Sequence, residues 1–170
     1  MAFHGIKTNI AIKLAILLAV AMLLVDIIMI IIAQRDYIQS AISKGYLLSY
    51  DIEKHLIKKP DSGILILQPD YKDKLSVIID MAGFSCVILQ DRNSNIIYPD
   101  SPNCPLFDEL KVINKESIES SRKKTQLTGT AWGVFWMQDR YIVVSVPLLM
   151  EGRTEAGVSF VMELENIYKV

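Results

Sequence analysis

The stretch that decides the fold is Ile10–Lys59. Residues 10–33 read IAIKLAILLAVAMLLVDIIMIIIA, and residues 34–59 read QRDYIQSAISKGYLLSYDIEKHLIKK. Leu14–Ala33 contains one charged residue, Asp26. A helix of that length spans about 30 Å, the thickness of a bilayer's hydrocarbon core. We therefore expect a transmembrane helix at residues 10–33 that continues into a helix at residues 34–59.

The charges that flank this apolar run predict its orientation. Lys7 and Lys13 precede Leu14–Ala33, whereas Arg35 follows it and is offset by Asp36. Positive charge favours the cytoplasmic side. We therefore expect residues 1–9 in the cytoplasm and residues 34–170 outside, on a single-pass membrane protein. A cleaved signal peptide is the alternative, although such peptides have shorter apolar cores of about 7–15 residues.

Asp26 places a carboxylate inside the predicted span, where it costs about 2.5–3.5 kcal/mol on insertion scales. One interpretation is a side chain that faces a neighbouring helix and is hydrogen-bonded there. The other is a polar contact in a transmembrane bundle that carries a signal. Both interpretations require a partner helix.

Residues 34–59 have the spacing of an amphipathic stalk helix that ends before Pro60. Proline disfavours the helical region for the residue before it. The apolar positions recur at intervals of three and four, which places them on one helical face. They are Ile38, Ile42, Gly45, Leu48, Ile52 and Leu56. This face could pack on its own domain or on a second copy of the chain, and the sequence leaves both open.

Residues 60–163 have the pattern of one domain that mixes helices and strands. After a short apolar piece at residues 64–68, a helix is expected from an Asp70 N-cap to a stop at Gly83. Residues 84–98 read as a β-hairpin. A further helix is expected from Phe107 to residues 122–124.

Three more strands are expected in the last third of the chain, at Thr125–Met137, Tyr141–Leu149 and Ala156–Met162, and residues 163–170 have helical propensity. This element order predicts an α+β domain with a five-stranded antiparallel sheet flanked by helices. The 18 Lys and Arg residues nearly balance the 19 Asp and Glu residues, for a net charge of −1. No basic surface is therefore expected, which argues against a nucleic-acid partner.

Two cysteines, Cys86 and Cys104, have two interpretations. In an oxidising compartment they could form a disulfide that closes a loop of about 18 residues, worth roughly 3 kcal/mol in the chain-entropy model. Alternatively, Cys86 is a small core residue and Cys104 a loop thiol. Their spacing fits no zinc or haem motif, and we expect no metal and no cofactor.

Catalysis has little support in the sequence, and we expect no enzyme activity from this chain. Nucleophile-elbow, metalloprotease and nucleotide-binding motifs are absent. Only two histidines occur, His4 and His55. The spacing from His55 to Pro60 matches a histidine-kinase phosphoacceptor box, but Leu56 stands where an acidic residue is usual. We therefore interpret His55 as an exposed stalk residue.

A small-molecule pocket needs apolar walls and a few convergent polar groups. Trp132 and Trp136 would share one face of the predicted strand 125–137, with aromatic and basic residues on neighbouring elements. An arginine there could bind a carboxylate with two hydrogen bonds. The predicted ligand-binding residues are Tyr98, Arg122, Trp132, Trp136, Arg140 and Tyr141. The alternative is that the aromatic residues belong to the core and that the basic cluster complements a helix end.

The apolar helix, the stalk, the hairpin sequence VILQDRNSNIIY at residues 87–98 and the segment VVSVPL at residues 143–148, followed by Ala156–Val158, resemble the PAS-like Cache sensor domains. These are extracytoplasmic input modules of bacterial sensor histidine kinases and chemoreceptors, and the resemblance therefore implies a bacterial inner membrane as the location of this chain. The resemblance implies a PAS-like fold at residues 60–163, a ligand pocket beside the sheet, a homodimer through the stalk and transmembrane helices, and a second span approached by residues 164–170.

The function that we expect is a membrane-anchored sensory input module that binds a small ligand and relays a helix displacement across the membrane. A chemoreceptor input domain is a close alternative. The runner-up class is structural, because a pilin-like subunit also has an apolar N-terminal helix that leads into a sheet. Such subunits have a processed glycine followed by an aromatic residue, and here Ile6 follows Gly5.

Overall fold

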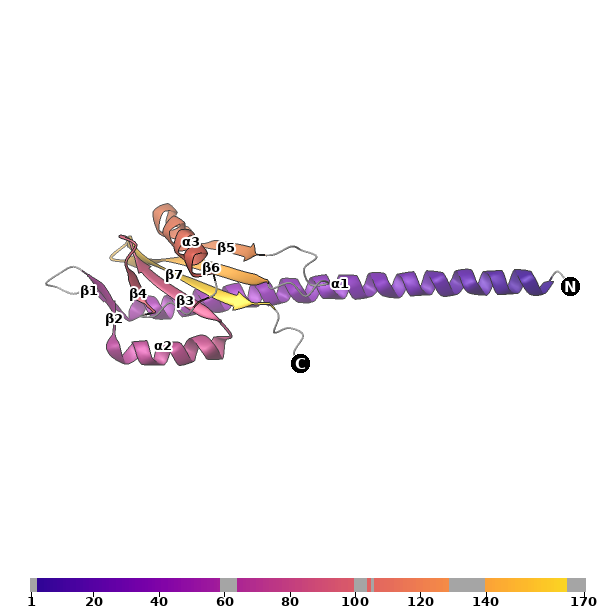
Figure 1. The fold of residues 1–170 in the computed structure, drawn as a ribbon, viewed down its shortest axis with the longest axis horizontal. Helices are drawn as coiled ribbons and strands as arrows, with labels where there is room; N and C mark the ends of the chain where they lie inside the picture. Colours follow the sequence, from indigo (N-terminus) through magenta and orange to yellow (C-terminus); the bar gives the residue numbers. More distant parts are fainter. Residues whose placement is uncertain (1–2, 59–63, 100–103, 105, 129–139, 165–170) are drawn as a thin grey trace. The chain divides into compact units, whose positions relative to one another are not determined.

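The computed structural model describes residues 3–58, 64–99, 104, 106–128 and 140–164, with side chains from residue 10 onward. The chain divides into two compact units, Met1–Ser40 and Ala41–Val170. Figure 1 shows the ribbon with its helices and strands labelled.

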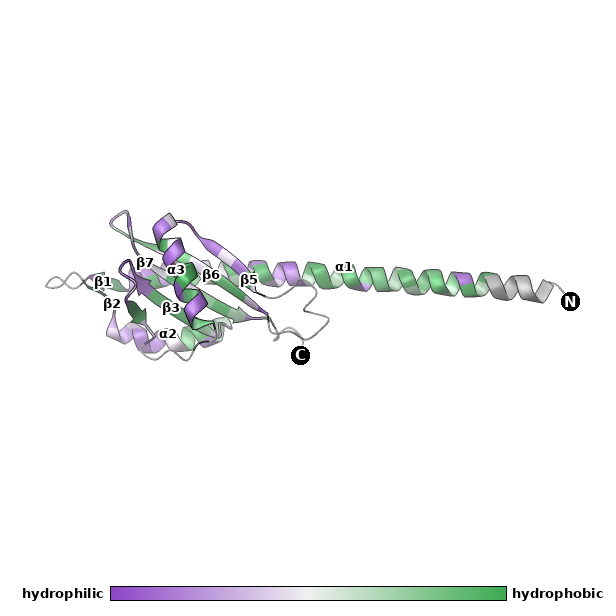
Figure 2. Ribbon diagram, turned by 45° about the horizontal axis from the view of Figure 1, so that its top comes forward, coloured by the Kyte–Doolittle hydropathy of each residue, from purple (hydrophilic) through white to green (hydrophobic). Residues whose placement is uncertain are grey.

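The first unit consists of the N-terminal part of helix α1, which runs from Phe3 to Lys54. Its apolar side chains are exposed all round the helix, and Figure 2 shows the nearly continuous hydrophobic colour of this part. This is the one helix in the described residues that is long and apolar enough to cross a membrane. Residues 10–33, the predicted transmembrane segment, thus form one uninterrupted helix, and its apolar side chains are mostly exposed.

The last turns of α1 belong to the second unit, where they form part of its core. Ala41, Gly45, Leu48, Ser49 and Ile52 are buried. Gly45, Leu48 and Ile52 belong to the predicted stripe, whereas Ile42 of that stripe is only half-buried and Ala41 is buried instead.

Helix α1 ends earlier than predicted. It stops at Lys54 rather than Lys59, because the chain turns at His55 and then forms strand β1 (Leu56–Lys58). Strand β1 pairs antiparallel with β2 (Leu65–Leu67) in a separate two-stranded sheet. The predicted apolar piece at residues 64–68 therefore contains a strand, β2. Its partner, β1, was predicted to be the end of the stalk helix.

Helix α2 (Pro69–Ala82) matches its prediction except at its start. The N-cap is Gln68, without a side-chain cap, and Pro69 stands at the first helical position. The predicted cap Asp70 lies instead in the first turn, because proline's fixed φ already suits helix entry. Gly83 ends the helix with a left-handed backbone, as predicted (φ 81°).

The predicted hairpin is confirmed as strands β3 (Cys86–Asp91) and β4 (Ile96–Tyr98). The carboxylate of Asp91 organises the turn. It accepts hydrogen bonds from the backbone N–H groups of Asn93 (2.9 Å) and Asn95 (2.8 Å) and from the Asn95 side chain (2.8 Å). Asp and Asn favour turns because of such local hydrogen bonds.

Helix α3 (Phe107–Ser120) is followed by β5 (Lys124–Thr128), β6 (Tyr141–Met150) and β7 (Arg153–Glu163). Together with the hairpin they form an antiparallel sheet in the order β4-β3-β7-β6-β5. The fold is α+β, as predicted. Several boundaries differ from the prediction. Helix α3 ends at Ser120, β5 begins at Lys124, and β7 runs from Arg153 through Glu163, where a helix was expected. The predicted strand beyond Thr128 and the helix at 165–170 lie outside the described residues.

The five-stranded sheet has two covered faces (Figure 1). Helix α3 packs on the face that carries Cys86, Ile88, Val143 and Val161. On the opposite face, a Cβ atom placed on Gly45 would lie 3.1 Å from Val144 Cγ1 and 3.5 Å from Phe160, so α1 lies directly on the strands there. The core is thus a three-layer arrangement with the sheet in the middle.

Candidate functional site

Four of the six predicted ligand-binding residues are described by the structure. Trp132 and Trp136 lie within residues 129–139, outside the described part of the chain. Tyr98 and Tyr141 are half-buried, Arg122 is exposed and Arg140 is buried. Their positions decide whether they can form a common pocket.

Tyr98 lies far from Tyr141 and Arg140. Tyr98 is on the edge strand β4, where it pairs with Leu89 of β3. Three strand-to-strand steps separate β4 from β6. At about 4.8 Å per step, that separation is roughly 14 Å. The structure therefore does not bring Tyr98 together with Tyr141 and Arg140.

Arg122 has a structural role through its backbone. Its N–H donates to Ser117 O (3.2 Å) and its carbonyl accepts from the Ser117 hydroxyl (2.8 Å), which closes the end of α3. Its guanidinium is exposed on the surface beyond this cap. The last turn of α3 contains no basic residue, so it is the backbone of Arg122 that closes this helix end.

The two lysines after Arg122 contact different helices. Lys123 Nζ lies 4.0 Å from the centre of the Tyr46 ring on α1, whereas Lys124 forms an ion pair with Glu116 on α3. Successive residues of an extended chain point to opposite faces of a sheet, which explains the split. The start of β5 is therefore attached to both layers that cover the sheet.

Arg140 is the most distinctive of the predicted residues. Its side chain is only 5 % exposed, and its Nε has no hydrogen-bond partner among the residues that the structure describes. Its backbone carbonyl accepts from Leu164 N (2.8 Å), which extends the β6–β7 ladder by one pair. A buried donor without a partner costs free energy, and an arginine can satisfy a carboxylate with two parallel hydrogen bonds.

Tyr141 lies on the other face of the sheet from Arg140, because adjacent residues of a strand alternate. It packs against the cluster under α3, together with Cys104 and Phe107. Thr128 holds its backbone from both sides: the Tyr141 N–H donates to Thr128 Oγ1 (3.2 Å), and that hydroxyl donates to Tyr141 O (3.1 Å). Tyr141 is thus a core residue, which was the alternative interpretation.

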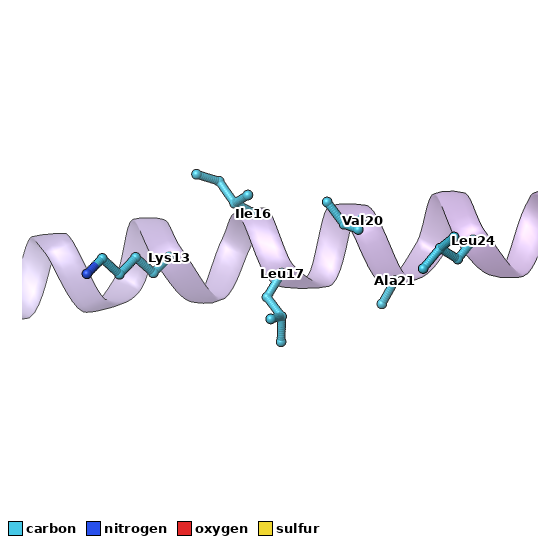
Figure 3. A pocket seen from close by; sticks show the side chains of 6 residues that line it. All are labelled: Lys13, Ile16, Leu17, Val20, Ala21 and Leu24. Carbon is cyan, nitrogen blue, oxygen red and sulfur yellow. The ribbon is translucent and has the colours of Figure 1, made fainter.

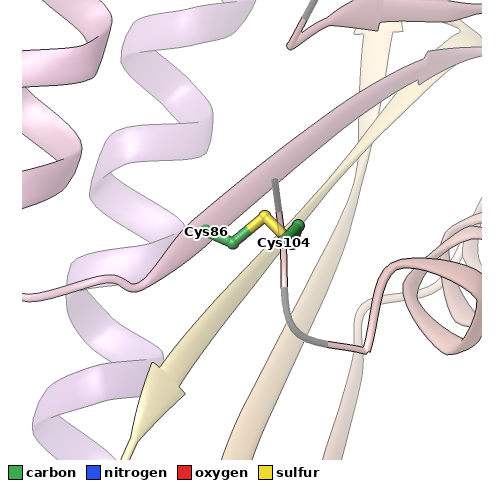
Figure 4. The surroundings of a disulfide bond; sticks show 2 residues. All are labelled: Cys86 and Cys104. Atoms are coloured by element: carbon green, nitrogen blue, oxygen red, sulfur yellow. A yellow bond between two sulfur atoms is a disulfide. The ribbon is translucent and has the colours of Figure 1, made fainter. Parts of the chain in front are cut away.

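Cys86 and Cys104 form a disulfide with a Cα–Cα distance of 5.5 Å (Figure 4). The bond attaches the segment before α3 to β3, beneath the same helix. Of the two interpretations that the sequence left open, the structure has the disulfide. Such bonds persist in oxidising compartments.

A series of buried hydrogen bonds connects α3 to the sheet, and it was not predicted from the sequence. Asn114 Nδ2 donates to Gly157 O (3.0 Å), Ser145 Oγ donates to Asn114 Oδ1 (3.3 Å), and Ser159 Oγ donates to Ser145 Oγ (2.9 Å). Asn114, Ser145 and Ser159 are fully buried. The available signal was an asparagine at an inward-facing helical position with serines at inward-facing strand positions.

A second polar cluster joins the end of α1 to α2. The Tyr71 hydroxyl donates to Asp51 Oδ2 (2.7 Å), and His55 Nδ1 lies 2.9 Å from Asp51 O. The rings of His55 and Tyr71 stack at 3.9 Å. Burial, and then the hydrogen bond to Asp51, raise the pKa of Tyr71. His55 thus lies directly after α1, where it is half-buried and stacked on Tyr71 rather than exposed as predicted.

Figure 3 shows a shallow hollow on the first unit, on the outside of α1. It is open along the helix, and its lining is apolar except for one lysine. The lining residues are Lys13, Ile16, Leu17, Val20, Ala21 and Leu24. Such a surface suits acyl chains, with the lysine positioned to reach the interface. Within the described residues, no group of three or more His, Cys, Asp and Glu side chains could hold a metal ion.

Comparison with known proteins gives no assignment, because no family model and no curated protein matches the chain. The functional argument therefore depends on the chain itself.

Proposed function

We propose that this chain is the membrane-anchored, extracytoplasmic sensory input module of a bacterial signal-transduction receptor, of the sensor histidine kinase type. Its partners would be membrane lipid, a second copy of the chain and a small ligand, with a carboxylate as the favoured ligand group. The chain itself would carry no catalytic activity.

The observation that carries this proposal is the continuity of α1. One helix contains the apolar segment and also supplies Ala41, Gly45 and Ile52 to the core of the sheet domain. A change in the packing of the sheet would therefore act on the last turns of α1. The earlier part of the same helix is long and apolar enough to cross a membrane. Small shifts of packed helices are a known means of transmitting a signal.

The order of the elements agrees with a PAS-like, Cache-type domain, which we include in the proposal. A long helix precedes a five-stranded antiparallel sheet in which β4 of the hairpin forms one edge, β5 forms the other, and the long strands β7 and β6 lie between β3 and β5. The disulfide favours an oxidising compartment, as expected for a domain outside the cytoplasm.

Arg140 supports the ligand-binding part of the proposal. Its buried Nε lacks a partner among the described residues, and an anion would supply one. Among the other described residues, Tyr141 packs against the cluster under α3, Arg122 closes the end of α3 and Tyr98 is remote. The proposed ligand contacts are therefore Arg140, together with Trp132 and Trp136, which lie outside the described residues.

The test is a thermal-shift screen of the full chain in nanodiscs against mono- and dicarboxylates, amino acids and inorganic anions. A ligand at 100 times its Kd stabilises the folded state by about 2.7 kcal/mol. For a domain of this size that corresponds to roughly 5–15 °C in Tm. We expect at least one carboxylate to produce such a shift in the wild type.

Three variants make this screen specific. Arg140→Gln should lose the shift, and Arg140→Lys should retain only part of it, because lysine lacks the planar fork of donors. Arg122→Gln is the matched control, since it removes an exposed arginine, and it should keep the full shift. If no compound stabilises the wild type, or if Arg140→Gln responds equally, the ligand-binding proposal is contradicted.

A pilin-like structural subunit remains the second candidate, because a continuous apolar helix that enters a sheet domain is common to both classes. The two proposals differ in their assembly. A pilin-like subunit would form long filaments in which α1 is buried among many copies, whereas a sensor module would stay in the membrane as a small oligomer. Electron microscopy of membranes that contain the full chain distinguishes them.

A further inference from the structure

Within the second unit, the last turns of α1 and helix α2 lie side by side on one face of the sheet (Figure 1). Lys44 Nζ donates to Ala82 O (3.3 Å), and the Tyr71 hydroxyl donates to Asp51 Oδ2 (2.7 Å). Residue numbers rise along α1 while those of its α2 partners fall, so the two helices are antiparallel. The C-terminal end of α2 therefore lies beside the first turn of the second unit, which begins at Ala41.

The C-terminal end of α2 is also fixed against the sheet. A Cβ atom on Gly83 would lie 3.9 Å from Met162 Cε, and the rings of Phe84 and Phe160 are 5.0 Å apart. Phe160 is also the β7 residue that Gly45 of α1 approaches. The position of this helix end is thus set by contacts with both α1 and β7.

This helix end exposes two large apolar side chains. Met81 is 82 % exposed, the highest value for any large apolar side chain in the described part of the chain, and Val77, one turn earlier, is 57 % exposed. Lys44, which contacts Ala82, and Asp80, which precedes Met81, carry opposite charges, so little net charge surrounds the two. We call Val77 and Met81 the α2 apolar end. Exposed apolar surface of this kind commonly marks an interaction site.

The length of the chain before the second unit indicates which partner is near. Ala41 is eight residues beyond Ala33, the last residue of the predicted span. These residues belong to α1 and are helical, so the link is about 12 Å long. The headgroup layer on each side of a bilayer's hydrocarbon core is roughly 5–7 Å thick. The link outside the headgroup layer is therefore shorter than one helix diameter of about 10–12 Å.

A tilt of α1 would close the remaining distance. Transmembrane helices tilt by about 20° on average, with a range of roughly 0–40°. Packed helices lie about 8–10 Å apart, so a tilt of about 20–40° toward α2 would bring α2 about 3–6 Å nearer to the bilayer than α1. Methionine is flexible and adapts to irregular apolar surroundings. Met81 would then reach the headgroup layer, where the burial of its apolar surface is favourable.

We propose that the α2 apolar end contacts the headgroup layer of the same bilayer that α1 crosses. Met81 would enter this layer more deeply than Val77. The contact would be apolar, so added salt should leave it intact, whereas salt screens an attraction between exposed charges. This inference rests on the membrane-anchored part of the proposed function, but not on ligand binding or on dimer formation.

Quenching of single fluorescent labels by nitroxide-labelled lipid tests the contact, with the full chain in phosphatidylcholine nanodiscs. The native cysteines are joined to each other, so one added cysteine carries the label, an NBD group. We expect strong quenching of Met81→Cys by a headgroup nitroxide and weaker quenching of Val77→Cys. Asp73→Cys is the control on the same helix, because it is exposed and lies about 12 Å farther along α2. Val112→Cys is the matched control on α3, with an exposure of 58 % against 57 % for Val77. At that separation we expect both controls to be quenched at least about fivefold less than Met81→Cys.

A second variant tests the same surface with the label kept at residue 77. Met81→Glu places a strongly hydrated carboxylate where the methionine would meet lipid, and removing such a group from water is costly. We expect quenching of labelled Val77→Cys to fall in this background to the level of Val112→Cys, and to persist with Met81→Leu. Because Met81 is mostly exposed, both substitutions should leave the domain folded. Protection of the native disulfide from alkylation reports folding in each variant.

Three outcomes would overturn the inference. The first is equal quenching of Met81→Cys and Val112→Cys, and the second is loss of the quenching in high salt. The third is a blue-shifted emission of Met81→Cys without quenching by lipid, which would show that protein, such as a second copy, covers this surface. If Val112→Cys is accessible only from outside the cytoplasm while Met81→Cys is not quenched, this inference fails and the anchored sensor module stands.

Discussion

The tight contact between Gly157 on β7 and helix α3 leads to a quantitative prediction. A Cβ atom at Gly157 would lie 2.4 Å from Asn114 Oδ1 and 2.7 Å from Ile118 Cγ1. The added methyl group would therefore overlap with both side chains. Asn114 cannot turn away without losing its hydrogen bond to the Gly157 carbonyl, because it is fully buried there. Gly157→Ala must therefore displace α3 from the sheet.

The magnitude follows from three contributions. Overpacking of a core costs about 1–3 kcal/mol. Loss of the two Asn114 hydrogen bonds costs about 0.5–1.5 kcal/mol each. The lower entropy of the unfolded alanine chain offsets about 0.4–1 kcal/mol. We expect Gly157→Ala to lower the free energy of unfolding by about 3 kcal/mol, summed from these contributions.

Gly45→Ala is the matched control on the opposite face. The Cβ atom of the new alanine would lie 3.1 Å from a side-chain methyl group of Val144, so that methyl group would have to shift slightly. Replacing a mid-helix glycine by alanine gains about 0.5–1 kcal/mol in helix stability. We expect these effects to cancel to within about 1 kcal/mol.

Urea pulse proteolysis of the full chain in detergent measures both variants, because it reports the folded fraction of the domain in the presence of the apolar helix. With an m-value of about 2 kcal/mol/M, Gly157→Ala should lower the midpoint by roughly 1.5 M. An unchanged midpoint for Gly157→Ala, or an equal loss for Gly45→Ala, would refute the packing of α3 described here.

Three further predictions concern single contacts. Replacing both Cys86 and Cys104 by serine removes a crosslink that closes a loop of 18 residues, and should cost about 3 kcal/mol in the same proteolysis assay. Because the pKa of Tyr71 is raised in the folded chain, that chain keeps the proton at pH values where the unfolded chain loses it. The contribution of Tyr71 to stability should thus be full below a pH of about 10 and fall above it, so Tyr71→Phe should make the decline in alkaline unfolding curves smaller. Tyr37, whose pKa is also raised by burial, contributes to the decline in both proteins. Lys124→Ala should change the free energy of unfolding by less than about 1 kcal/mol, since its ion pair with Glu116 is partly exposed, and a larger loss would show that β5 depends on this pair.

The local elements of this fold follow from the sequence because short-range chemistry determines them. Helices α2 and α3 follow from apolar residues at helical spacing, and the Asp91 turn follows from a run of turn-forming residues between two apolar strands. The long-range pairing is different, since β3 lies between β4 and β7, and no local pattern indicates that Cys86 stands opposite Val161. The β1–β2 pair was missed because Leu56 also fits the helical stripe.

The candidate site was predicted less well, for a reason visible at Arg140 and Tyr141. Adjacent strand residues face opposite sides of a sheet, so these two could not both line one pocket on a regular strand. The burial of Arg140, by contrast, depends on the packing of the assembled domain and could not be read from local sequence. The same holds for Asn114, whose partners are 31 and 43 residues away.

The sidedness of the sheet domain is the most direct test of the central claim, that α1 anchors this domain outside the cytoplasm. The measurement is labelling with a membrane-impermeant maleimide in bacterial cells whose outer membrane is permeable. Val112→Cys on α3 reports the domain, and Thr8→Cys reports the N-terminus. The account predicts that Val112→Cys is labelled in intact cells and Thr8→Cys only after the inner membrane is opened. The reverse pattern would contradict it.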